Sequence, residues 1–166
     1  MSDAYTHPLV QYLLKHADDR AMLAELRRGL GRDPGEAAGM YPYVMPFIDK
    51  VSQEKNIFLI ASLFALHPAH TGQGNMGDHL RAYTHAVGDD ASTTRRFTQL
   101  LNLRPKSLDV PLRQHIALLK SKDIAVNWHR LTRDVMHWGH PERYIQKQWA
   151  RQYWPQTETL NKKESS

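Results

Sequence analysis

The 166-residue chain contains no cysteine. Disulfide bonds and zinc sites built from thiolates are therefore excluded, as is a cysteine nucleophile. A protein without disulfides depends on its hydrophobic core for stability, and 166 residues are enough to bury one. The absence of cysteine fits a reducing compartment, and we expect a cytoplasmic protein.

Long apolar runs are also missing. The longest spans residues 57–66 and is interrupted by Ser62, whereas a membrane-spanning helix needs about 18 apolar residues. The first residues, MSDAY, lack the basic and then apolar pattern of a signal peptide. We therefore expect neither export nor association with a membrane.

Acidic residues are scarce in one part of the chain. Residues 1–90 hold 8 Lys or Arg and 11 Asp or Glu, a net charge of −3, whereas residues 91–154 hold 12 and 4, a net charge of +8. Positive charge confined to one region favours a polyanionic partner such as nucleic acid, and the alternative is a solvated basic surface without a partner. The shift predicts an N-terminal helical lobe at 1–90 and a basic C-terminal helical lobe at 91–155. Residues 156–166 contain one apolar residue, Leu160, and we expect a disordered tail there.

Strand patterns are lacking too, and nearly every segment carries signals for the start and end of a helix. Apolar residues recur at steps of three and four through residues 124–138, and helical spacing also marks 108–121 and 141–154. Residues 53–66 are apolar on almost every side, which predicts a helix in the middle of the core. We predict an all-α fold, a bundle of about eight helices in two lobes.

The last of these helices carries a basic line beside its apolar one. Arg143, Lys147 and Arg151 advance by four residues and so share one helix face. We expect most tryptophans in the core rather than stacked on bases, because helical spacing places them on apolar lines: Trp128, Trp138 and Trp149. Guanidinium groups on rigid helices would then contact a nucleic-acid backbone with little reading of base sequence.

Motifs for catalysis are absent as well. There is no G-x-S-x-G sequence, and no carboxylate pair has a spacing that suggests acid–base or two-metal chemistry. Ten histidines are present, but neither His67 with His70 nor the set Asp134, His137 and His140 matches a metal-binding pattern. We predict a protein that is not an enzyme and that uses no metal or cofactor. The alternatives are a histidine-dependent metal nuclease and a helical scaffold that contacts only protein.

Several short segments follow one another in an order and spacing similar to those of a known family. They are LRRG at 26–29, ASLFALHP at 61–68, RRF at 95–97, LRQHIALLKSK at 112–122, WHRL at 128–131, RD at 133–134, W at 138 and WARQY at 149–153. Together they resemble the CasB family, the small subunit of the type I-E CRISPR surveillance complex called Cascade.

This resemblance implies a non-catalytic, all-helical subunit that works beside the other Cascade subunits and the guide RNA, with a second copy of itself alongside. Its basic surface would help to hold the target strand and the displaced strand of the R-loop, in which guide RNA pairs with one strand of the DNA. The nucleic-acid-binding residues that it implies are all arginines: Arg27, Arg28, Arg95, Arg96, Arg113, Arg130, Arg133, Arg143 and Arg151. The charge pattern alone also points to the C-terminal members of this set.

Overall fold

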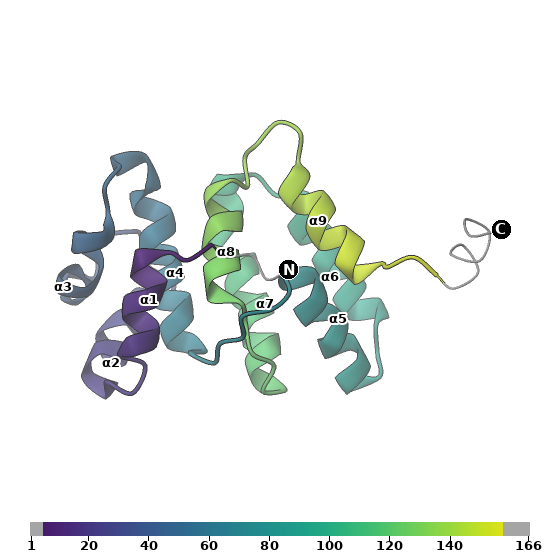
Figure 1. Ribbon diagram of the computed structural model, residues 1–166, viewed down its shortest axis with the longest axis horizontal. Coiled ribbons are helices and arrows are strands. Elements are labelled where there is room, and N and C mark those ends of the chain that lie inside the picture. The colour runs from purple at the N-terminus through teal and green to yellow at the C-terminus, as the bar shows by residue number, and fades with distance from the viewer. Residues whose placement is uncertain (1–4, 158–166) are drawn as a thin grey trace.

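The structure is a computed structural model that describes residues 5–157 (Figure 1). In this range the chain forms nine α-helices and no strand. The helices are α1 (Pro8–Lys15), α2 (Arg20–Arg27), α3 (Tyr41–Val44), α4 (Glu54–Leu66), α5 (Met76–Val87), α6 (Ala91–Leu101), α7 (Asp109–Ser121), α8 (Trp128–Met136) and α9 (Tyr144–Tyr153). Single turns of 3-10 helix occur between some of them: η1 (Ala38–Met40), η2 (Met45–Phe47), η3 (Val51–Gln53) and η4 (Pro105–Ser107). The predicted all-α fold is confirmed.

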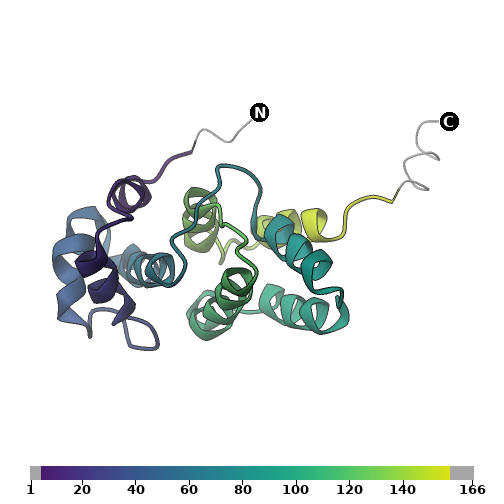
Figure 2. The ribbon, with the colours of Figure 1, turned by 90° about the horizontal axis from the view of Figure 1, so that it is seen from below.

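Helix α4 lies in the interior of the molecule. It packs against α1, α2 and α3 and also against α7 and α8, and most of its side chains are buried. In Figure 1, α1 to α4 lie at the left, α7 and α8 in the middle, and α5, α6 and α9 at the right. Figure 2 shows the same succession along the long axis, seen from below. The prediction of a central core helix over residues 53–66 is therefore confirmed. This helix is buried because it is apolar on nearly every side.

Helices α5 and α9 approach each other closely. A Cβ atom on Gly77 would lie 2.0 Å from the backbone oxygen of Trp149, so this approach requires glycine. Asn75 starts α5 with a capping box, in which its side chain accepts from the backbone of Gly77 and Asp78 while the Asp78 carboxylate accepts from the Asn75 N–H. The lobe boundary at residue 90 stays a prediction, and α5, which precedes it, packs against α9, which follows it.

Three tryptophans form much of the core around α8 and α9, as predicted, and each is fully buried. Their indole N–H groups all have acceptors: Trp128 donates to the Ala69 carbonyl at 3.0 Å, Trp138 to the Leu103 carbonyl at 2.8 Å and Trp149 to the Asp134 carboxylate at 2.7 Å. Because a buried N–H without a partner would be costly, these acceptors fix the tryptophan orientations.

The helix predicted over residues 124–138 is shorter in the structure and begins at Trp128. The segment before it is extended, since the Val126 N–H donates to the Ala69 carbonyl at 3.1 Å and the Thr71 N–H donates to the Val126 carbonyl at 3.0 Å. Asn127 then caps the helix by accepting from the Arg130 N–H. A pairing between segments more than fifty residues apart leaves no helical or strand period in the sequence.

The predicted start of the last helix at Pro141 is wrong by three residues. Helix α9 begins at Tyr144 because Arg143 has a φ of 55°, in the left-handed region, where a helix cannot continue. Gln156 and Thr157 are exposed, and residues 158–166 of the predicted tail lie outside the described residues. Among residues 5–157, no helix combines the length and the apolar content that crossing a membrane would need.

Candidate nucleic-acid interface

A buried carboxylate holds the first of the candidate arginines. Asp134 is fully buried on α8, one helical turn after Arg130, and its Oδ1 accepts from Arg130 Nε at 3.2 Å. Its Oδ2 accepts from the indole N–H of Trp149. Burial raises the pKa of the Asp134 carboxyl, while the hydrogen bond from Trp149 and the charge of Arg130 act to lower it. The carboxylate thus joins α8 to α9 and fixes the Nε edge of the guanidinium.

The other edge of the Arg130 guanidinium contacts α9. Its Nη2 donates to Gln148 Oε1 at 2.9 Å, and both residues line an open, polar hollow of about 390 Å³ between α5, α8 and α9. The rest of the lining comes from the end of α9 and the start of α5: Arg151, Gln152, Gly74, Asn75 and Asp78. Two of the nine predicted arginines, from different helices, therefore share one hollow.

A buried histidine of α5, His79, accepts a backbone hydrogen bond at the start of α8. The Asn127 N–H donates to His79 Nε2 at 3.0 Å, and Asn127 Nδ2 donates to the Gly74 carbonyl at 3.0 Å. Burial lowers the pKa of His79 to about 4, although the nearby Asp78 charge acts to raise it. The neutral imidazole that accepts this hydrogen bond is consequently the stable form at neutral pH.

Three more histidine rings accept backbone N–H groups near the same segment. His7 Nδ1 caps α1 by accepting from Leu9, His129 Nδ1 accepts from His7, and His70 Nδ1 accepts from Trp128. Burial lowers the pKa of His7, of His70 and of His129. These histidines therefore join the first helix, the loop after α4 and the start of α8. Among the described residues, no group of three or more histidine, aspartate or glutamate side chains could hold a metal ion.

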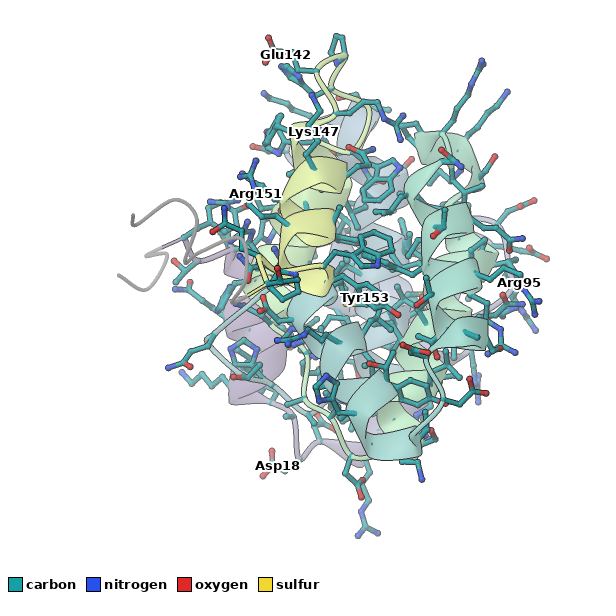
Figure 3. All side chains as sticks on the ribbon, turned by 90° about the vertical axis from the view of Figure 1, so that its right-hand side faces the viewer. Asp18, Arg95, Glu142, Lys147, Arg151 and Tyr153 are labelled. Atoms are coloured by element: carbon teal, nitrogen blue, oxygen red, sulfur yellow. The ribbon has the colours of Figure 1, made fainter. Side chains whose placement is uncertain are left out.

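Arg95 and Arg96 are exposed on the first turns of α6. Arg96 lines a different hollow, between α6 and α7, together with Gln114 and His115. Figure 3 shows Arg151 projecting from α9 to one side of the molecule and Arg95 projecting to the other, with Tyr153 between them. The structure thus separates the α6 pair from the hollow that contains Arg151.

Two further arginines of the C-terminal half contact other parts of the chain. Arg143 is exposed, and its Nη2 donates to the Leu101 carbonyl beside a hollow that Arg104 also lines. The Arg133 guanidinium lies over the ring of Tyr5, with its central carbon 5.4 Å from the ring centroid, a cation–π geometry. Arg104 was not among the predicted residues, because its sequence context beside Pro105 indicates only a linker.

The remaining predicted arginines lie around α2. Arg27 and Arg28 are exposed near its end, and Arg28 pairs with Glu25 at 3.5 Å. Arg113 of α7 reaches the turn after α2, since a Cβ atom on Gly31 would lie 2.8 Å from Arg113 Nη1. The nine arginines therefore lie on several elements, which are α2, α6, α7, α8, α9 and the turn before α9.

Sequence reasoning missed the polar partners that complete the hollow, which are Gln148, Gln152 and Asn75. The spacing of Arg130 and Asp134 by four residues was the available signal for their ion pair. A glutamine on a helix surface carries no such signal, because its role depends on which helix lies opposite.

Comparisons with known proteins agree across sequence and structure. The family model described as "CRISPR-associated protein Cse2" matches residues 22–154. A CRISPR-associated protein Cse2 from Thermus thermophilus is 33% identical over 139 residues, which are 81% of this chain and 79% of the relative. The crystal structure of CasB from Thermus thermophilus is 29% identical with a TM-score of 0.75 and covers 89% of this chain and 98% of that one. A chain from a structure described as "CRISPR RNA-guided surveillance complex", 24% identical, has the same fold, with a TM-score of 0.77 and coverage of 94% and 95%.

Proposed function

Because the chain belongs to the CRISPR-associated Cse2 family, we propose that it is a non-catalytic, cytoplasmic subunit of an RNA-guided surveillance complex of the Cascade type. Its partners in this proposal are the other Cascade subunits, the guide RNA, the target DNA and a second copy of itself. Its role is to contact the nucleic-acid backbone with a basic surface and so to stabilise the R-loop.

The observation that carries the nucleic-acid part of this proposal is the shared hollow of Arg130 and Arg151. Arginine remains charged at all physiological pH values, and its planar fork matches the geometry of a phosphate. The remaining side chains around the two arginines are polar, with Gln148, Gln152 and the Asp78 carboxylate among them, and they offer little apolar surface for a base. This chemistry supports contact with the backbone rather than with base edges.

Modest contacts of this kind are sufficient for the proposed role. Replacing a DNA duplex with an RNA–DNA heteroduplex is nearly balanced in free energy, so protein contacts with the strands can tip the exchange. Contacts with phosphates do not depend on base sequence, and a subunit that must work with every guide needs this property.

Gel mobility of the purified chain with single-stranded and duplex DNA of mixed sequence tests the proposal at about 50 and 200 mM salt, a range over which phosphate contacts weaken strongly. We expect sequence-independent binding that falls steeply with salt, with a log–log slope of about −0.7 for each phosphate contact on single strands. No binding at the lower salt, or binding that salt does not change, would contradict it.

A protein scaffold without nucleic-acid contact is the second candidate, and the arginines that contact their own chain favour it. Arg143 donates to the Leu101 carbonyl and Arg28 pairs with Glu25, so their charges have roles within the fold. Reversing the exposed charge with Arg151→Glu separates the two functions. The scaffold would retain both its assembly with partner subunits and their DNA affinity, whereas the proposed function requires the affinity to fall.

A further inference from the structure

We propose that the hollow between α5, α8 and α9 seats one phosphate group of a nucleic-acid strand, and that Asp134 is a positioning residue that presets the Arg130 guanidinium for it. This inference rests on the proposed function. It adds a defined binding site for one phosphate and a buried carboxylate that promotes phosphate binding by orienting Arg130.

The Arg130 guanidinium is held in one orientation by two helices. Arg130 is held at Nε by Asp134 at 3.2 Å and at Nη2 by Gln148 at 2.9 Å, and its side chain is 19% exposed. An arginine on an open surface loses rotamer entropy when it binds a ligand. Arg130 has already lost most of that freedom in the folded protein, because α8 and α9 together define its position.

The carboxylate that holds Arg130 is itself held in the core. Asp134 has no exposed surface, and its second oxygen accepts from the buried indole of Trp149 at 2.7 Å. The carboxylate is therefore not available to a ligand, and its interactions lie on the Arg130 side and in the core. A buried carboxylate that orients a cation at the wall of a hollow is the arrangement expected of a second layer behind a binding group.

Positive charge predominates among the side chains that face the hollow. Among the described residues that line it, Arg130 and Arg151 are positively charged and Asp78 is negatively charged. Asp78 is engaged in the capping box of α5, where its Oδ2 accepts from the Asn75 N–H at 2.8 Å. Arg151 is exposed on α9 and projects outward in Figure 3, so it can close on a phosphate that Arg130 has received.

The charge of Asp134 makes the inference testable in an unusual direction. Asp134→Asn keeps the size of the side chain but raises the net charge of the protein from +5 to +6. General electrostatic attraction would then strengthen binding to nucleic acid. Positioning predicts the opposite, because the amide cannot hold both donors, and the Arg130 guanidinium would lose its fixed orientation.

The experiment measures fluorescence anisotropy of a labelled, mixed-sequence single-stranded DNA with the full chain at about 50 mM salt and at several higher concentrations. We expect Asp134→Asn to weaken binding about tenfold, the loss of one charge-assisted contact, and to reduce the salt slope by about 0.7. Glu142→Gln adds the same unit of charge at an exposed position, labelled in Figure 3, and should bind as tightly as the wild type or more tightly.

Two further variants separate positioning from folding. Trp128→Phe removes an indole N–H that donates to the Ala69 carbonyl and not to Asp134, so it destabilises the core, and its affinity at a temperature where it is folded should match the wild type. Arg130→Lys keeps the charge and loses the fork, and it should weaken binding several-fold even if Asp134→Asn does not fold.

Each outcome decides the matter. Wild-type protein that fails to bind the DNA at low salt overturns the proposed function, and this inference with it. Wild-type protein that binds while Arg130→Lys binds equally well, or while folded Asp134→Asn matches Glu142→Gln, overturns the seat and leaves the proposed function standing. A loss in both Arg130→Lys and Asp134→Asn, with affinity not reduced in Glu142→Gln or in Trp128→Phe, supports the seat.

Discussion

Two pairs of arginines in this molecule come together in different ways. Arg95 and Arg96 are neighbours in the sequence, and both are exposed on the surface of α6. Arg130 and Arg151 are 21 positions apart and meet only because α8 and α9 pack around a buried carboxylate. The clustering of basic residues in the sequence identifies the first pair. The packing of α8 and α9 creates the second pair, in which the buried Asp134 carboxylate holds Arg130.

The largest expected effect comes from forcing apart the helices that frame the hollow. Gly77→Ala places a Cβ atom 2.0 Å from the Trp149 backbone oxygen, where α5 meets α9. We expect the free energy of unfolding to fall by more than about 3 kcal/mol, measured by urea denaturation, because backbone atoms on two helices must separate. Gly72→Ala is the control, since nothing lies within 4 Å of its Cβ position, and it should change stability by less than about 0.5 kcal/mol. Equal stabilities of the two variants would contradict the close approach.

Protonation of His79, whose ring accepts the Asn127 N–H at the start of α8, should lower the free energy of unfolding by a similar amount. The pKa of His79 is about 4 in the folded protein, below the ordinary value of 6.5. A lowered pKa gives stability that is fully present above pH 6.5 and is lost as the pH falls through 4, about 3 kcal/mol in all. His79→Gln retains an acceptor for the Asn127 N–H and cannot titrate, so its stability should depend less on pH between 7 and 4. His85→Gln, at an exposed histidine on the same helix, is the matched control variant.

Truncating one member of each arginine pair compares their roles in the fold. Arg130→Ala leaves the Asp134 charge buried without its ion pair, and we expect unfolding to become easier by about 2 kcal/mol. Arg95→Ala should cost less than about 0.5 kcal/mol, because this arginine is exposed. Thermal denaturation of the two variants under the same conditions makes the comparison. A comparable loss from both would show that the layer beneath Arg130 contributes nothing to stability.

The smallest effect concerns the exposed partner in the hollow. Arg151→Ala should reduce affinity for single-stranded DNA about threefold and lower the salt slope by about 0.7, the value for one phosphate contact. Arg95→Ala, which removes the same charge from the other side of the molecule, should change the slope less. A larger effect from Arg95 would move the main contact surface from the hollow to α6.

Much of the fold could be predicted from the sequence because its signals are local. Asn75 and Gly88 delimit α5, with a capping box at the start and a left-handed glycine at the end, and both are short-range sequence signals. The tryptophans on apolar lines are buried, as helical spacing indicates. Each of these features depends on residues within a few turns of one another.

The hollow could not be predicted in the same way. Helical spacing places Arg151 on a basic line, but it does not specify which neighbouring helix that line faces. The pairing of Val126 with the chain around His70 joins distant segments and shortens the expected helix, and only the folded chain reveals it. The charge pattern thus identified the basic helices, and their packing determined which arginines meet.

The histidine rings that accept backbone N–H groups also fix where their own protons lie. A ring nitrogen that accepts cannot carry a proton, so the neutral tautomers are Nε2–H for His7, His70 and His129 and Nδ1–H for His79. A metal ion that coordinated Nε2 of His7, His70 or His129 would have to move that proton to Nδ1, and the backbone hydrogen bond there would be lost. These imidazoles are thus committed, by their tautomeric state, to joining segments of the chain.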